Sequence, residues 1–185
     1  MKAPSVVETW GSSAAERAAA YGCDGLINCP DRSLFRAVDI DAPVPLVFRW
    51  LCQLRVAPYS YDVVDNFAKR SPRHLIDGLD RLEVGQRFMR IFRLVAFEEG
   101  RSITLDSTTA MFGRVATTYV VTPIDEGRSR LVVKLEFKVS SHGLRSTLRR
   151  QVLPPGDLIM MRKQLRTLKK LAQRDATCLR NGGVG

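Results

Sequence analysis

The most restrictive feature of this sequence is an amphipathic stretch near its C-terminal end. Between Asp157 and Arg174, apolar residues recur at the spacing of one helix face, and Lys and Arg residues occupy the other side. The apolar stripe consists of Leu158, Met161, Leu165, Leu168 and Ala172. Asp157 follows the breaker run Pro154-Pro155-Gly156, which predicts that the helix begins there with Asp157 as its N-cap. Such a helix is stable only against an apolar surface that other segments supply.

The segment after residue 85 changes to a period of two, which predicts that surface. Strands are expected at 86–98, 102–107, 114–122 and 130–139. The last is the clearest, with Leu131, Val133, Leu135, Phe137 and Val139 on one face and Lys134, Glu136 and Lys138 on the other. Short turns between long strands predict an antiparallel meander with one apolar and one wet face.

Four further elements complete the predicted order. A first strand is expected at 34–40, a helix at 43–54, a short helix and a turn at 70–82 and another short helix at 144–152. The order predicts an α+β fold in which a curved antiparallel sheet wraps around a long C-terminal helix. The gap between a bent sheet and a straight helix is expected to form an apolar cavity of the kind that binds small molecules.

Arg90 and Arg93 are unusual in the predicted strand 86–98, because large apolar residues lie on both of its faces. In a regular strand one of the two would point toward the cavity and would need an anionic partner. A bulge that turns both side chains outward is the alternative.

The length of 185 residues, 45% of them apolar, is sufficient for one core with an extension. We divide the chain into an N-terminal extension of loop or partial helix (1–32), one domain (33–175) and a flexible tail (176–185). Within the extension, Ser13 and Glu16 have the spacing of a helix capping box. No apolar run reaches the ~18 residues of a membrane span, and the first residues lack the apolar segment of a signal peptide. These features predict a cytoplasmic protein.

Four cysteines, at positions 23, 29, 52 and 178, lack the spacing of a metal site. Free thiols are the expectation, and a disulfide between Cys23 and Cys29 is the alternative. His74 and His142 lack spaced partners, so we expect no metal. The chain contains neither a Gly-x-Ser-x-Gly elbow nor a Gly-rich phosphate loop after a strand, and we expect no cofactor.

The net charge is +10, and the excess of Lys and Arg is concentrated between residues 141 and 180. A basic helix face attracts nucleic acid or an anionic membrane surface. No nucleic-acid-binding motif and no interleaving of aromatic with basic residues accompany it, so we expect no nucleic-acid partner. A solvated outer face and a weak contact with an anionic membrane surface are the open alternatives.

The segment 56–66 concentrates tyrosines and carboxylates in a stretch that is too irregular for a long element. It either forms a loop that binds its own backbone through Asp62, Asp65 and Asn66, or it places Tyr59, Tyr61 and Asp65 at the rim of a pocket.

Several short motifs connect these elements to a known family. They are residues 39–43 with 47–51 in the first strand, turn and helix, residues 59–62 with 65–66 in the tyrosine-rich segment, and residues 156–158 with 160–165 in the closing helix. In these motifs the chain resembles the SRPBCC superfamily, which includes START-domain and birch-pollen-allergen-like proteins, and in particular bacterial proteins of the polyketide cyclase/dehydrase type. The resemblance implies a helix-grip fold. Members of the superfamily bind lipids, sterols, polyketides or plant hormones, and some catalyse cyclisation or hydrolysis.

We therefore predict that the protein binds a hydrophobic or amphipathic small molecule, lipid- or polyketide-like, between the sheet and the C-terminal helix. The alternative is a cyclase- or dehydratase-type enzyme that uses general acid–base chemistry, with Tyr61 and Asp65 as catalytic candidates. A third hypothesis is an interaction protein that uses the basic helix face. The sequence leaves catalysis and the oligomeric state open. The candidates for the ligand-binding site are Trp50, Tyr59, Tyr61, Asp65, Phe92, Tyr119, Phe137, Met161 and Leu165.

Overall fold

A computed structural model describes residues 6–59, 71–108, 113–138 and 144–182 of the chain. For 144–158 and Gly182 it describes the backbone alone. All statements below concern these residues.

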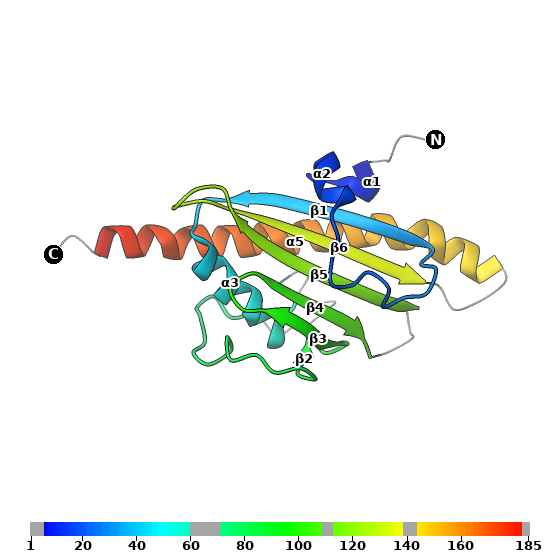
Figure 1. Ribbon diagram of the computed structural model, residues 1–185, viewed down its shortest axis with the longest axis horizontal. Coiled ribbons are helices and arrows are strands. Elements are labelled where there is room, and N and C mark those ends of the chain that lie inside the picture. The colour runs from blue at the N-terminus through cyan, green and yellow to red at the C-terminus, as the bar shows by residue number, and fades with distance from the viewer. Residues whose placement is uncertain (1–5, 60–70, 109–112, 139–143, 183–185) are drawn as a thin grey trace.

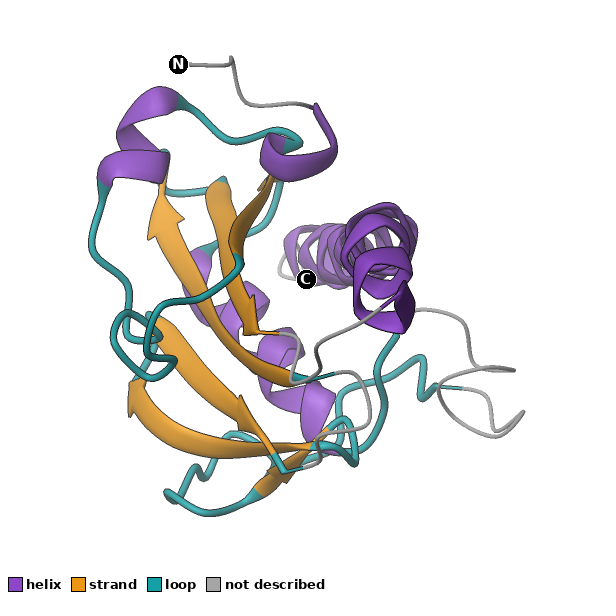
Figure 2. Cartoon of the chain, turned by 90° about the vertical axis from the view of Figure 1, so that its right-hand side faces the viewer, coloured by secondary structure: helices purple, strands orange, loops and turns teal. Residues whose placement is uncertain are grey.

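Six antiparallel strands form one sheet, in the order β1-β6-β5-β4-β3-β2. Figure 1 shows the long helix α5 (Leu144–Gly182) running behind the sheet along its length, and Figure 2 shows the sheet curving around it. The strands are β1 (Arg32–Ile40), β2 (Arg87–Phe88), β3 (Phe92–Glu98), β4 (Ser102–Ser107), β5 (Arg114–Pro123) and β6 (Ser129–Lys138). This arrangement confirms the predicted α+β helix-grip architecture.

The main core lies on the concave side of the sheet, where α5 and the shorter helix α3 (Val44–Cys52) pack. The alternating face of β6 contributes Leu131, Val133, Leu135 and Phe137, as its pattern predicts. From α5, the buried members of this core are Met161, Leu165, Leu168, Leu171, Ala172 and Ala176. The predicted helix stripe is therefore confirmed at every member whose side chain is described, and Leu171 and Ala176 extend it.

The predicted boundaries of the C-terminal helix are wrong at both ends. The structure has one helix from Leu144 to Gly182, so Asp157 is not an N-cap and 144–152 is not a separate helix. The helix also includes most of the stretch that we expected to be a flexible tail. Ala176 explains this, because it lies one turn beyond Ala172 and is 5% exposed in the same core.

The predicted strand 86–98 is interrupted by a tight hairpin. Met89 and Arg90 adopt positive φ angles of 45° and 66°, and β2 turns back onto β3 with Phe88 opposite Phe92. Positive φ is uncommon for residues that carry a Cβ. Arg90 and Arg93 are both exposed, so neither faces the core, and the outward alternative is the one observed. The reversal occurs in a hairpin, and a bulge-like shift of register between Leu94 and Ala96 follows in β3.

The short helix expected at 70–82 is not observed. Its described residues, 71–82, form turns and bends.

The N-terminal extension covers part of the convex face, which we expected to be wet. It contains two short helices, α1 (Val6–Thr9) and α2 (Ala14–Ala18). The 3-10 helix η1 (Gln53–Arg55) lies elsewhere, directly after α3. Tyr21, Cys23 and Ile27 form a second apolar cluster with Phe35, Ala37, Ala116 and Val132 of the sheet. The predicted capping box is present, with Ser13 and Glu16 each accepting a hydrogen bond from the other's backbone N–H.

Two groups of ion pairs fix the extension to the sheet. The Arg130 guanidinium on β6 lies 2.7 Å from Glu16 of α2 and 2.9 Å from Asp39 of β1. Lys134 pairs with Asp24 and lies 3.1 Å from Glu136. Lys134 and Glu136 are thus covered by the extension rather than solvated, which corrects the prediction of a fully wet face.

The close approach of the extension to the edge strand depends on one glycine. The backbone N–H of Ala37 donates to the Trp10 carbonyl at 3.0 Å. Gly11 follows with a φ of +75°, and a Cβ at this position would collide with the Ala37 carbonyl oxygen. A residue with a side chain is therefore excluded on both conformational and steric grounds.

The pairing with Arg130 makes the attachment of the extension sensitive to acid. The hydrogen bonds from Arg130 lower the pKa of Glu16 from 4.5 to about 2. Because the folded-state pKa is depressed, the stabilisation is complete above pH ~4.5 and is lost as the pH falls toward ~2. We expect Glu16→Gln to lower the free energy of unfolding by about 1–2 kcal/mol at pH 7, a value reduced for partial exposure, and to change little at pH 2.

Urea unfolding at the two pH values measures this difference. The matched control is Glu98→Gln, which removes a carboxylate from the exposed pair with Arg101 and should cost less than about 0.5 kcal/mol. Equal losses in Glu16→Gln at pH 7 and pH 2 would contradict the assignment.

Candidate ligand-binding site

A buried polar pair lies inside the otherwise apolar interface between sheet and helix. The Tyr119 hydroxyl on β5 donates to the Gln164 side-chain oxygen on α5 at 2.8 Å. The two residues are 1% and 2% exposed. The Gln164 amide nitrogen donates to the Pro58 carbonyl at 2.6 Å, so the pair joins the sheet, the helix and the segment that follows α3. Buried polar groups of this kind hold a core in one arrangement because each needs its partner.

Sulfur atoms surround this pair. The Met161 sulfur lies 3.9 Å from the Tyr119 hydroxyl, and the Met89 sulfur lies 3.3 Å from the Gln164 amide nitrogen. Methionine side chains are flexible and polarisable, and they adapt to differently shaped neighbours. Two neighbours of the pair can therefore change conformation at low cost.

Left-handed backbone conformations gather at the same place. Tyr59, with a φ of 56°, directly follows Pro58, and Met89, with a φ of 45°, contacts Gln164. The Met89 backbone N–H donates to the Leu54 carbonyl at 2.8 Å, which holds the hairpin against the end of η1. Such conformations cost on the order of 1–3 kcal/mol each and concentrate at functional sites.

Trp50 and Tyr59 form an aromatic wall between α3 and the segment that follows Pro58. Their rings meet edge to face at 6.0 Å and 89°. The Trp50 indole N–H donates to Asp175 on α5 at 3.0 Å, which links α3 to the long helix. Both side chains are almost fully buried, at 0% and 2% exposure.

The described candidates all belong to the concave core or pack against it, but they are distributed along it. Trp50, Tyr59, Tyr119, Phe137, Met161 and Leu165 belong to the same buried core cluster, and Phe92 packs against it half-buried. Tyr61 and Asp65 lie outside the described residues, so their roles stay predictions. We missed Gln164 and Met89, although the sequence contains a signal for Gln164, because it falls on the apolar stripe between Met161 and Leu168.

The polar pair offers hydrogen bonding to a ligand rather than nucleophilic attack. A phenol and a carboxamide can together hold a carbonyl or a hydroxyl group. Cys52 belongs to the same core, but burial raises its pKa to about 12, so it stays a thiol at neutral pH. Among the described residues, no group of three His, Cys, Asp or Glu side chains could hold a metal ion. The four cysteines are free, which agrees with the prediction.

Comparisons with known proteins place the fold. No family model matches the chain, and no curated protein is similar to it at a significant level. The Zhui aromatase/cyclase of a Streptomyces species is 18% identical over 77% of this chain and 94% of its own, with a TM-score of 0.51. A Thermobifida fusca protein is 15% identical over 77% of this chain and 93% of its own, also with a TM-score of 0.51. These likenesses confirm the predicted polyketide cyclase-like, helix-grip fold.

The contribution of the polar pair can be measured with a double-mutant cycle. Gln164→Leu removes the partner of the Tyr119 hydroxyl and of the Pro58 carbonyl, and we expect a loss of about 1–3 kcal/mol. Tyr119→Phe should cost about 1 kcal/mol, and the double variant should cost less than the sum because the two changes remove one shared bond.

Urea unfolding gives the free energies. Gln173→Leu, which removes an exposed hydrogen bond to Asp41 from the same helix, is the control and should stay within about 0.5 kcal/mol of the parent. Strictly additive losses would contradict direct coupling between Tyr119 and Gln164.

Proposed function

We propose that the protein binds a hydrophobic or amphipathic small molecule, lipid- or polyketide-like, between the concave face of the sheet and α5. The observation that carries the proposal is the Tyr119–Gln164 pair, which is buried among apolar side chains and adjoined by left-handed backbone at Tyr59 and Met89. Ligand sites in proteins are mostly apolar and contain a few converging polar groups. The helix-grip fold is also typical of proteins that bind small hydrophobic ligands.

The arrangement favours a ligand with an apolar body and one polar group. The body would lie against Phe137, Met161 and Leu165, and a carbonyl or hydroxyl would hydrogen-bond to Tyr119 or Gln164. Burial of ~300 Å² of apolar ligand surface contributes ~7 kcal/mol before the costs of association, so one or two polar contacts suffice for micromolar affinity.

Uptake requires side chains of the core to move. The lining candidates Met161 and Phe137 are 7% and 5% exposed, and Leu165 is fully buried. Met161 and Met89 are suited to this movement because an unbranched thioether changes rotamer at low cost. We therefore expect the ligand to displace methionine side chains rather than the aromatic wall of Trp50 and Tyr59.

We further propose that this binding takes place in the cytoplasm. The described residues contain no helix that is long and apolar enough to cross a membrane.

A bulky residue at the centre of the interface tests the location of the site. We expect Leu165→Trp to reduce binding of the neutral fluorescent probe Nile red at least tenfold, because an indole would occupy the space of the ligand. The same change at Leu179, which is 68% exposed on the same helix, is the control and should retain binding.

Fluorescence titration measures both variants, and circular dichroism checks their folding. Met161→Phe adds less volume and replaces Leu165→Trp if that variant does not fold. Unchanged Nile red affinity in a folded Leu165→Trp protein would contradict the proposed location.

A cyclase- or dehydratase-type activity is the second candidate. Two polar side chains, Tyr119 and Gln164, converge inside the interface, and the Streptomyces protein with the same fold is an aromatase/cyclase by name. In this case Tyr61 and Asp65 would supply general acid–base chemistry to the bound molecule.

Variants that remove the acid–base group of Tyr61 or Asp65 separate catalysis from binding. For an enzyme, we expect Tyr61→Phe or Asp65→Asn to reduce turnover of a poly-β-keto substrate analogue at least 100-fold while Nile red affinity is retained. Absence of turnover by the parent protein, with ligand bound, would contradict the enzymatic candidate and leave binding as the function.

A further inference from the structure

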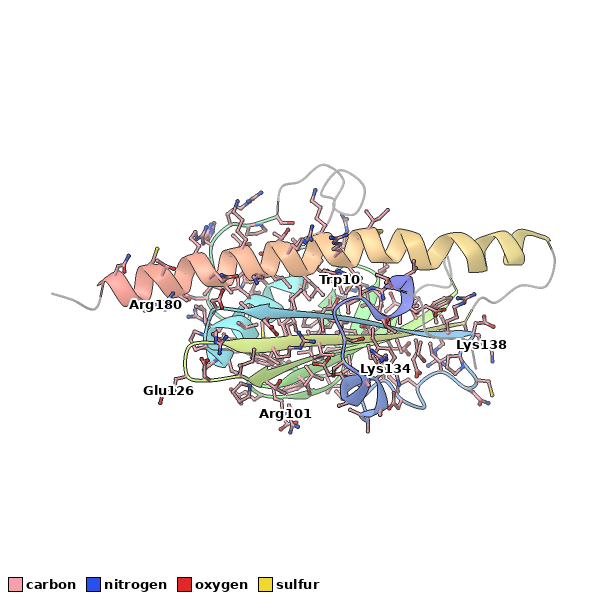
Figure 3. The ribbon with its side chains drawn as sticks, turned by 90° about the horizontal axis from the view of Figure 1, so that it is seen from above. Trp10, Arg101, Glu126, Lys134, Lys138 and Arg180 are labelled. Carbon is pink, nitrogen blue, oxygen red and sulfur yellow. The ribbon has the colours of Figure 1, made fainter. Side chains whose placement is uncertain are left out.

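A basic groove runs along α5 and reaches the edge of its buried stripe at Leu171. It has a volume of about 530 Å³ and is lined by Arg73, Ile159, Arg162, Lys163, Arg166, Thr167, Lys170 and Leu171. Five of these residues are cationic, and none is acidic. Figure 3 shows α5 along one side of the molecule, with its outer face turned away from the sheet.

Contacts with neighbouring segments order the walls of the groove. The guanidinium groups of Arg162 and Arg166 lie 5.4 and 6.0 Å from the centre of the Trp10 ring. Cation–π contacts of this kind restrict the orientation of an arginine. On the other wall, Arg174 donates to the Arg73 carbonyl at 2.7 Å, which joins the segment around Arg73 to the helix.

The distribution of charge along α5 is unfavourable for the isolated protein. Between 159 and 181 the helix contains seven Lys or Arg residues and one acidic residue, Asp175. Asp175 is already bonded to Trp50 and Arg174. Arg162, Arg166 and Lys170 follow one another at i, i+4 spacing, where like charges repel and destabilise a helix. An anionic partner would relieve this repulsion.

Exposed apolar side chains lie beside these cations. Ile159 lines the groove and is 56% exposed, and Met160 next to it is 40% exposed. Phosphate contacts, which dominate non-specific binding of a soluble polyanion, would leave these aliphatic groups exposed. A membrane interface uses both kinds of residue, because cations contact the head groups while apolar side chains reach the acyl boundary.

We propose that the outer face of α5 docks on an anionic phospholipid bilayer. Arg73, Arg162, Arg166 and Lys170 contact the phosphate groups, and Ile159 and Met160 enter the head-group boundary. This inference does not depend on what occupies the interior between sheet and helix.

Sedimentation with vesicles tests the proposal. At low salt we expect the full chain to bind vesicles of phosphatidylcholine with phosphatidylglycerol and not vesicles of phosphatidylcholine alone. Binding should weaken steeply as salt is added, because the head-group attraction is screened. Equal binding to neutral and anionic vesicles would overturn the proposal.

Charge reversal locates the docking face. The double change Arg166→Glu and Lys170→Glu should lower vesicle partition at least tenfold. The control changes Arg87 and Arg101 to Glu, which alters the net charge by the same amount at exposed positions outside α5. Figure 3 shows Arg101 on the side of the molecule away from α5. Equal loss in both double variants would overturn the assignment to this face.

Two further double variants test whether the partner is a membrane or a soluble polyanion, and whether lost binding reflects misfolding. Ile159→Ser with Met160→Ser should weaken vesicle binding at least threefold and leave binding to inorganic polyphosphate unchanged. If this variant keeps full vesicle affinity, the groove is a polyanion site and the membrane proposal fails. Arg166→Gln with Lys170→Gln should lose vesicle binding with little change in melting temperature, because the relief of like-charge repulsion offsets the lost contact of Arg166 with the Trp10 ring. Nile red uptake without vesicles should be unaffected in these variants, so this proposal and the proposed function fail separately.

Discussion

Burial of the apolar stripe of α5 against the concave face of the sheet is the contact on which the other features depend. Leu165, Leu168 and Ala172 are at most 1% exposed, and they share one core with the alternating face of β6 and with β1, the strand that α5 contacts most. Since a helix with so many cations on its outer face gains little from its own sequence, this packing supplies most of its stability. It also brings the ends of α3, η1 and β2 to the same side of the sheet.

The polar pair follows from this geometry. Gln164 lies on the buried stripe, so its amide must find partners inside the interface, and it finds Tyr119 and the Pro58 carbonyl. Because the Gln164 side chain also contacts Met89, it holds both the segment after η1 and the Met89 hairpin against α5. The only strongly polar position on the described stripe is thus also the position where three separate parts of the chain meet.

The sequence predicted those features that depend on regular periodicity. The stripe of α5, the alternating face of β6 and the capping box at Ser13 and Glu16 needed only local spacing. The hairpin at Met89 and Arg90 was missed because nothing in local spacing reports a left-handed backbone at residues other than Gly, Asn or Asp. The continuation of α5 across Pro154 and Pro155 was missed because these residues usually end a helix.

Other features depend on tertiary contacts that no local pattern contains. The convex face of β6 looked solvated because Lys134 and Glu136 alternate with apolar residues, yet the extension covers them through Asp24 and Tyr21. Trp50 falls outside the apolar stripe of its own helix, and its burial depends on Tyr59 and on Asp175, which is 125 residues away. For the candidate site, the sequence indicated which kinds of side chain would be buried. It did not indicate which hydrogen-bond partners they would have.

The most direct measurement of the central claim is native mass spectrometry of the protein purified from the cells that produce it, under mild desolvation. We expect an adduct with a mass on the order of a few hundred daltons, since the interface suits one drug-sized molecule. Its fragmentation would give the class of the ligand. The mass of the unliganded chain alone, under conditions in which added Nile red stays bound, would contradict the claim that this interface holds a natural ligand.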